Sequence, residues 1–172
     1  GLMTNAGFES VIMADNLRGE NGGLVLPEFC DQTVRKINQA LSPAGIDRLL
    51  DIHNPLDVTP MADDATFGAC LEALVEDKNV DCAVISIVPV TAVLQTLPPG
   101  EAHHENIYDE NSLAGYLIRA FKKTDKPMVV NIDAGQLYDP LAEYLEDNGL
   151  PVFRRCDRAL AFLKRFVAIH KA

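Results

Sequence analysis

The sequence predicts an α/β protein in which helices cover both faces of a mostly parallel, five-stranded sheet. Short apolar runs alternate with segments of helical periodicity along the 172 residues, and this alternation is typical of βαβ units. The length and the hydrophobic content of 48% fit one domain with a substantial core. We therefore expect a single doubly wound α/β/α domain over residues 1–172.

The predicted strands lie at residues 2–4, 49–53, 82–88, 128–132 and 151–153. Helical periodicity falls at residues 8–17, 28–41, from 63 onward, 111–123, 137–147 and after 153. The continuous apolar run 82–88 is typical of a central strand that is covered on both faces. A glycine-rich break at 18–23 ends the first helix, and Gly149 ends the fifth. Four side chains of the first helix are expected to face inward: Phe8, Val11, Ile12 and Ala14.

Charge and composition exclude several classes of protein. The formal net charge of -10, from 25 acidic and 15 basic residues, would repel a phosphate backbone, so nucleic acid is not an expected partner. No apolar run approaches the roughly 18 residues that a membrane-spanning helix needs. The 4 cysteines are widely spaced, which fits reduced thiols in the cytoplasm. Because the chain opens with Gly1-Leu2-Met3 and a short first strand, we expect it to be part of a longer protein.

The loop Thr4-Asn5-Ala6-Gly7 joins the first strand directly to a helix. In an open parallel sheet, ligands bind beyond the carboxyl ends of the strands. The unpaired N–H groups and the dipole of the following helix favour an anion at such a loop, and small residues let it approach the backbone. The pattern also fits a purely structural turn in which Asn5 caps the helix and Gly7 relieves the backbone.

The loop after the predicted second strand, residues 53–60, contains two prolines and several polar side chains. Prolines make a loop rigid, and rigid loops position chemistry well, so the polar residues Asn54, Asp57 and Thr59 are candidates for a functional role. The alternative is structural: Asn54 and Asp57 form turn hydrogen bonds, and Thr59 caps the next helix.

The long segment 97–110 contains His103 and His104 among carboxylates. Adjacent histidines point in different directions and no HxxxH or HExxH spacing is present, so we expect a mobile lid or an interface loop and no metal site. The sequence contains no GxSxG, GxGxxG or phosphate-binding P-loop pattern, and we expect no catalytic residue in this chain.

Two motifs carry a resemblance to a known family. Thr4-Asn5-Ala6-Gly7 at the start of a helix, followed by Asn54-Pro55-Leu56-Asp57, resembles the third, flavodoxin-like domain of ADP-forming acyl-CoA synthetases, which are related to succinyl-CoA synthetase. Val88-Pro89, Lys126-Pro127 and the segment 149–152 extend the resemblance over almost the whole chain.

The resemblance implies part of an acid–thiol ligase that is not active alone. The family interconverts acyl-CoA, a nucleoside diphosphate and phosphate with the free acid, CoA and a nucleoside triphosphate, through an acyl phosphate and a phosphohistidine. Carried over from the family, the first turn would stabilise phosphate or phosphohistidine through Thr4, Asn5, Ala6, Gly7 and Phe8. The neighbouring pocket wall would consist of Asn54, Asp57 and Thr59. The implied partners are CoA-binding, phosphohistidine and ATP-grasp domains, with CoA, ADP or ATP, and Mg bound there. A homodimer is also compatible with the sequence.

The chain departs from the family pattern after Gly7, where a second glycine is usual and Phe8-Glu9 stands instead. A ring and a carboxylate beside the anion site would weaken phosphate binding. This departure favours a rival hypothesis, a non-catalytic module that senses acyl-CoA or nucleotide or docks another domain. A flavin carrier is a third alternative, which the lack of a hydroxyl-rich first loop and of Trp disfavours.

Overall fold

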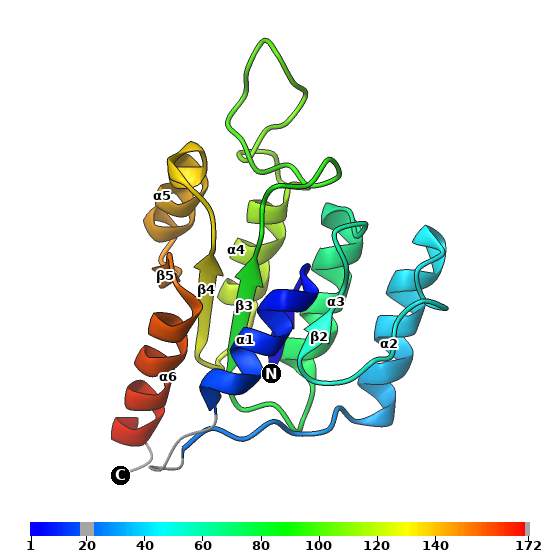
Figure 1. Cartoon of the computed structure of the whole chain (residues 1–172), viewed down its shortest axis with the longest axis vertical. Helices are drawn as coiled ribbons and strands as arrows, with labels where there is room; N and C mark the ends of the chain where they lie inside the picture. The colour runs from blue at the N-terminus through cyan, green and yellow to red at the C-terminus, as the bar shows by residue number, and fades with distance from the viewer. Residues whose placement is uncertain (18–22, 171–172) are drawn as a thin grey trace.

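The computed structural model describes residues 1–17 and 23–170. The strands are β1 (Leu2–Thr4), β2 (Leu56–Asp57), β3 (Ala83–Ile87), β4 (Met128–Ile132) and β5 (Val152–Phe153). The helices are α1 (Gly7–Leu17), α2 (Asp31–Leu41), α3 (Asp64–Glu76), α4 (Leu113–Lys123), α5 (Asp139–Asp147) and α6 (Cys156–His170), with short 3-10 turns η1 (Ser42–Ala44) and η2 (Gln136–Tyr138). Figure 1 shows the strands between two layers of helices.

The sheet has the strand order β2-β1-β3-β4-β5, and each of its pairings is parallel. From β1 the chain first winds to β2 on one side and then crosses to β3 on the other, so the winding reverses between β1 and β3. This arrangement confirms the predicted doubly wound α/β fold. The carboxyl ends of β1 and β3 therefore border the place where open α/β sheets bind ligands.

Two apolar clusters hold the helices to the sheet. The smaller cluster packs Met13 of α1 and Leu160 of α6 against Val84 and Val129. The larger one fills the opposite face, where α2, α3, α4 and α5 cover the sheet. Successive side chains of a strand point to opposite faces, and all five residues of β3 and of β4 are buried. The apolar run 82–88 is thus a central strand, as predicted.

Two predictions about local structure are wrong. Residues 49–53 form turns and irregular backbone, and the second strand begins later, at Leu56. On α1 the buried side chains are Glu9 and Met13, whereas Phe8, Val11 and Ile12 are exposed and Ala14 is half-buried. The helix sits at the carboxyl end of a very short β1, and its packing against α6 decides which side is buried. The predicted break at 18–23 lies, apart from Gly23, outside the described residues.

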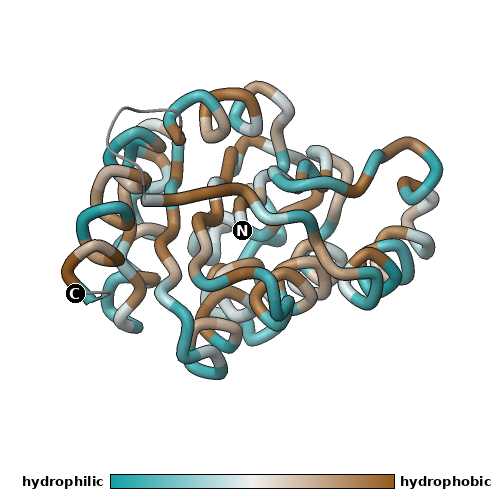
Figure 2. Tube along the Cα trace, turned by 90° about the horizontal axis from the view of Figure 1, so that it is seen from below, coloured by the Kyte–Doolittle hydropathy of each residue, from teal (hydrophilic) through white to brown (hydrophobic). Residues whose placement is uncertain are grey.

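A hydrophobic stretch at residues 24–26 crosses the end of the molecule that carries the amino ends of the strands (Figure 2). Its central residue, Val25, is 85% exposed. At the opposite end, the segment between β3 and α4 projects beyond the sheet (Figure 1). The Glu105 carboxylate accepts hydrogen bonds from the backbone of Thr96 and Leu97, and Asp64 accepts them from Gln95 and Leu113. The buried carboxylate of Asp64 and the half-buried carboxylate of Glu105 therefore hold the long segment where it leaves the sheet.

None of the helices in the described part of the chain is long and apolar enough to cross a membrane.

Candidate functional site

The candidate site lies where β1 ends and α1 begins. The carbonyl oxygen of Ala6 accepts hydrogen bonds from the backbone of Glu9 at 3.0 Å and Ser10 at 3.2 Å, which closes the first turn of the helix. Within the described residues, the exposed N–H groups of Gly7 and Phe8 donate to no acceptor. Two backbone donors at the positive end of a helix dipole can bind an oxygen-bearing anion.

Thr4 and Asn5 hold this turn from beneath. Both are completely buried. The Thr4 hydroxyl oxygen accepts a hydrogen bond from the Ala6 N–H at 3.2 Å. The Asn5 amide both donates to the carbonyl of Val88 and accepts from its N–H, each at 2.9 Å, and so joins β1 to the chain leaving β3. Their side chains therefore position the turn, and the groups that can meet an anion are backbone groups.

Gly7 faces a carboxylate. A side chain at this position would begin 3.2 Å from Oδ2 of Asp57, at the end of the neighbouring strand β2. The other oxygen of Asp57 accepts a hydrogen bond from Thr59 N–H at 2.9 Å. Asp57 therefore lies beside the turn, and its negative charge opposes an approaching anion. A pocket wall formed by Asp57 and Thr59 stays a prediction.

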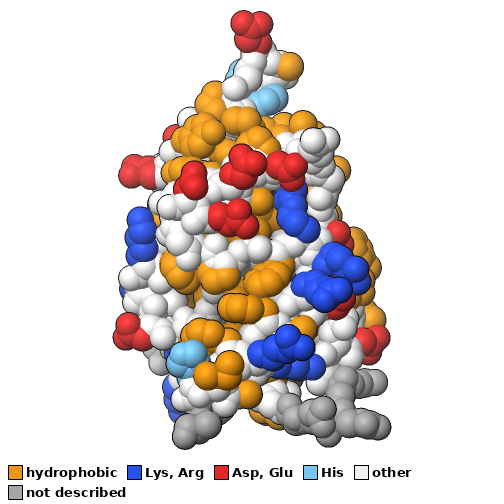
Figure 3. Space-filling view, turned by 90° about the vertical axis from the view of Figure 1, so that its left-hand side faces the viewer, with side chains coloured by type: hydrophobic (Ala, Val, Ile, Leu, Met, Phe, Trp, Pro, Cys, Tyr) orange, Lys and Arg blue, Asp and Glu red, His pale blue; other side chains and the backbone are white. Residues whose placement is uncertain are grey.

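Further acidic side chains lie toward the end of the molecule that carries the long segment. Figure 3 shows them gathered on the α5–α6 side of the molecule. The overall charge of -10 acts in the same direction. An anion at this turn would therefore need the N–H groups of Gly7 and Phe8 and a positive charge that balances Asp57.

Asn54 lies away from the other predicted site residues. Its side-chain oxygen accepts a hydrogen bond from the backbone of Leu2 at 2.9 Å, and its amide donates to the carbonyl of Pro27 at 3.1 Å. These contacts are at the amino end of β1, whereas the candidate site is at its carboxyl end. Thr59 does not cap α3 either, because Asp63 accepts the capping hydrogen bond from Thr66.

Phe8 and Glu9 point in opposite directions. The Phe8 side chain is 57% exposed, so its ring does not fill the turn. Glu9 is 1% exposed and lies beneath α1, where its Oε2 accepts a hydrogen bond from the Ser86 hydroxyl at 3.0 Å. The departure from the family pattern thus places a ring at the surface and a carboxyl group inside the protein.

Glu9 belongs to a buried polar network that the sequence analysis missed. Asn131, paired with Ser86 across β3 and β4, donates to the Ser86 hydroxyl at 2.9 Å. Burial, and second a hydrogen bond with Asp133, raise the pKa of Glu9 to about 7. The signal was available in the sequence, since Ser86 and Asn131 are the polar residues of two otherwise apolar strands.

The histidine-containing segment is ordered by local contacts. Nδ1 of His103 accepts a hydrogen bond from the backbone of Glu105 at 3.2 Å, and Gly100 bridges to His103. Across residues 1–17 and 23–170, no group of three or more His, Cys, Asp or Glu side chains could hold a metal ion.

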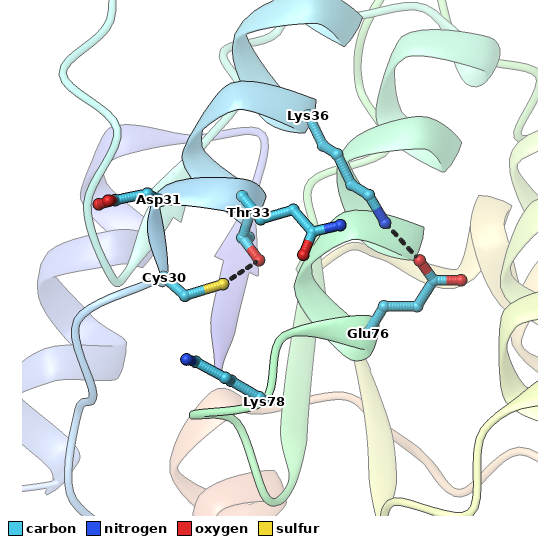
Figure 4. A pocket seen from close by; sticks show the side chains of 7 residues that line it. Cys30, Asp31, Thr33, Lys36, Glu76 and Lys78 are labelled. Atoms are coloured by element: carbon cyan, nitrogen blue, oxygen red, sulfur yellow. Dashed lines mark hydrogen bonds and ion pairs between the residues drawn. The ribbon is translucent and has the colours of Figure 1, made fainter.

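A second hollow, of about 330 Å³, opens at the beginning of α2 (Figure 4). Cys30 and Thr33 contact each other there at 3.3 Å, and Lys36 forms an ion pair with Glu76 at 2.8 Å. The hydrogen bond from Thr33 lowers the pKa of the Cys30 thiol. No residue predicted to bind a ligand lines this hollow, and four of its side chains are bonded to one another in two pairs, Cys30 with Thr33 and Lys36 with Glu76.

The fold and the turn at α1 define a flavodoxin-like α/β domain with a candidate anion site at its switch point. No family model matches the chain. The chain is 30% identical over 157 residues to the alpha subunit of acetate–CoA ligase [ADP-forming] II from Pyrococcus furiosus. The match covers 90% of this chain and 30% of the relative. Over most of its length the chain is therefore similar to part of an ADP-forming acetate–CoA ligase subunit, which confirms the family resemblance predicted from its motifs.

Solved structures agree on the fold. PH0766 from Pyrococcus horikoshii OT3 matches with a TM-score of 0.71 and 27% identity over 91% of this chain and 32% of that one. Dinucleotide-forming acetyl-coenzyme A synthetase 1 of Ca. Korarchaeum cryptofilum matches in its apo form with a TM-score of 0.70 and 19% identity, over 99% of this chain and 35% of that one. A second structure of this synthetase, in complex with phosphate and ADP, gives the same TM-score. The chain spans about a third of the length of these proteins.

Proposed function

We propose that this chain is a non-autonomous domain of a nucleotide-dependent acyl-CoA ligase, in which the beginning of α1 stabilises phosphate or a phosphohistidine. The observation that carries the proposal is the pair of unbonded N–H groups of Gly7 and Phe8 at the switch point of the sheet. Homology to part of an ADP-forming ligase supports the same chemistry. The domain would bind and orient the phosphoryl group, and it would supply no catalytic side chain.

The remaining chemistry belongs to other parts of the proposed enzyme. CoA would bind a CoA-binding domain, the phosphorylated histidine would lie in a second domain, and ADP or ATP with Mg would bind an ATP-grasp domain. These would act with the present domain in one multidomain protein or assembly, with a homodimer as a compatible arrangement. The cytoplasm is the compartment we propose for it.

The negative charges of two nearby carboxyl groups, those of Glu9 and Asp57, oppose phosphate binding. Glu9 is buried and its pKa is raised to about 7, so at neutral pH it carries only part of a full negative charge. Asp57 is half-buried and faces Gly7. A positively charged group from a partner domain, placed beside Asp57, would remove the repulsion and complete the site.

The Asp57 carboxylate also supports a second candidate function, that of a docking or sensing module without a role in phosphate transfer. Asp57 would then anchor a donor from the docked partner, and the exposed ring of Phe8 would pack against it. The two functions differ in one measurable property, because only the ligase domain needs affinity for phosphate.

Phosphate affinity of the purified chain, measured by 31P NMR titration, tests the proposal. Replacing Asp57 with Asn removes a charge beside the anion and should tighten phosphate binding roughly tenfold, because charges a few Å apart near a surface interact by about 1–4 kcal/mol. Gly7→Ala should weaken it, since the new methyl group occupies the approach to the N–H groups.

Asp125→Asn is the matched control, because it removes an exposed carboxylate before β4, at the other end of the sheet. Its phosphate affinity should equal that of the wild type. An unchanged affinity in both Asp57→Asn and Gly7→Ala would exclude the proposed anion site. Acyl-CoA formation after mixing with the CoA-binding, phosphohistidine and ATP-grasp modules would test the ligase role itself.

A further inference from the structure

A groove of about 410 Å³ runs between α1 and α6. Its lining comes from α1, from the residue that follows β4, and from the beginning of α6: Glu9, Ile12, Asn16, Asp133, Arg155, Cys156 and Asp157. The buried Glu9 and Cys156 lie deep in the groove, and the exposed Asp133 lies at its mouth. The proposed phosphate site uses the backbone at the first residues of α1 and leaves this groove without a role.

Two buried oxygens of this region lack hydrogen-bond donors, one on Glu9, which lines the groove, and one on Asn131, which lies behind it in β4. Oε1 of Glu9 and Oδ1 of Asn131 have no partner, although Glu9 is 1% exposed and Asn131 is fully buried. The two residues are linked through Ser86, which donates to Glu9 and accepts from Asn131. A buried acceptor without a donor costs free energy, so this position favours a ligand that donates hydrogen bonds.

The charges of the groove favour a cation. Arg155 is held by Asp157 through two contacts of 3.0 and 2.9 Å, so their charges largely cancel. Among the described residues, neither Glu9 nor Asp133 forms an ion pair. No other charged side chain lines the groove, and Cys156 has a thiol whose pKa burial raises to about 12. Two carboxyl groups therefore face the groove without a balancing cation.

We propose that Glu9 and Asp133 form a binding site for a primary ammonium group in the groove between α1 and α6. An ammonium group brings one positive charge and three N–H donors, which match the exposed carboxylate of Asp133 and the unpaired oxygen of the buried Glu9. A metal ion fits less well, because the described residues offer no group of three or more His, Cys, Asp or Glu ligands.

A thermal melt of the full chain with methylammonium chloride tests the site, because a ligand bound only by the folded state raises the melting temperature. Tetramethylammonium chloride at the same concentration is the matched salt, since it has the charge and no N–H donors. We expect methylammonium alone to raise the melting temperature.

The apparent affinity should be roughly tenfold higher at pH 8 than at pH 6, because a proton competes at Glu9 below its pKa of about 7. Glu9→Gln keeps the shape of the side chain and should abolish the methylammonium shift. Glu143→Gln, on the exposed side of α5, should keep it. Equal shifts with the two salts, a shift that persists in Glu9→Gln, or the absence of any pH dependence would each overturn the proposal.

Two further ligands identify the source of the ammonium group. Nα-acetyl-lysine amide represents a lysine side chain of a partner domain, and putrescine represents a free amine. The ligand with the larger shift at pH 8 identifies the source, and either result supports the site. If neither ligand shifts the melting temperature of the wild type, the groove does not bind a primary ammonium group.

Discussion

Replacing Glu9 with Gln should change how stability depends on pH. In the folded protein the pKa of Glu9 rises from an ordinary value of about 4.5 to about 7, mainly because the carboxyl group is buried. Between these values the folded state holds a proton that the unfolded state has lost. The contribution of Glu9 to the free energy of unfolding is therefore largest below pH 4.5, and it is lost as the pH rises from 4.5 to about 7.

The size of the effect follows from the same two values. Each pH unit between about 4.5 and about 7 removes roughly 1.4 kcal/mol, so the complete loss is about 3 kcal/mol. This is a large part of the stability of a small domain. Glu9→Gln has no proton to lose, and its free energy of unfolding should stay level where that of the wild type declines.

Urea denaturation at several pH values between 4.5 and 8 measures the difference. Across this range, the free energy of unfolding of Glu9→Gln should rise by about 3 kcal/mol relative to that of the wild type. Glu143→Gln removes an exposed carboxylate, and its curve should run parallel to that of the wild type. Parallel curves for Glu9→Gln and the wild type would show that Glu9 is ionised in the folded protein, and the argument from its burial would fail.

Two other substitutions probe how the elements around the site are held. Gly68→Ala should cost about 1–3 kcal/mol in a denaturation experiment, because the new methyl group would overlap the Tyr116 ring where α3 packs on α4. A native-like stability there would mean that the two helices separate easily. Glu105→Gln should leave the melting temperature nearly unchanged but speed hydrogen exchange at the amides of Thr96 and Leu97, which donate to the Glu105 carboxylate at 2.6 and 3.1 Å. Unchanged exchange at both amides would contradict the role given to this carboxylate.

Much of the fold was visible in the sequence because central strands and long helices have strong patterns. The strands at residues 83–87 and 128–132 were predicted from apolar runs, and the structure places both within the sheet interior. The left-handed backbone at Gly149 likewise ends α5 where the glycine predicted it. The second strand was misplaced, because it has only two residues and its pairing with β1 defines it.

The candidate site was predicted in part. The turn Thr4-Asn5-Ala6-Gly7 does join β1 to α1. It was predicted because small residues between a strand and a helix are a turn signal that depends only on local sequence. The inward direction of Glu9 was not predicted, because the packing of α1 against α6 sets it. Asn54, predicted as part of the pocket wall, lies at the amino end of β1, and the sequence did not show this because its partners Leu2 and Pro27 are distant along the chain.

By itself, the sequence determined the class of fold, the position of the turn between the first strand and the first helix, and the family resemblance, because these depend on residues that are close together along the chain. Only the tertiary structure decided which charges surround that turn. It brings Asp57 from β2 to Gly7, and Asp133 from beyond β4 to Glu9. Electrostatic energy depends on distance in space and on burial, and neither quantity can be read from spacing along the sequence.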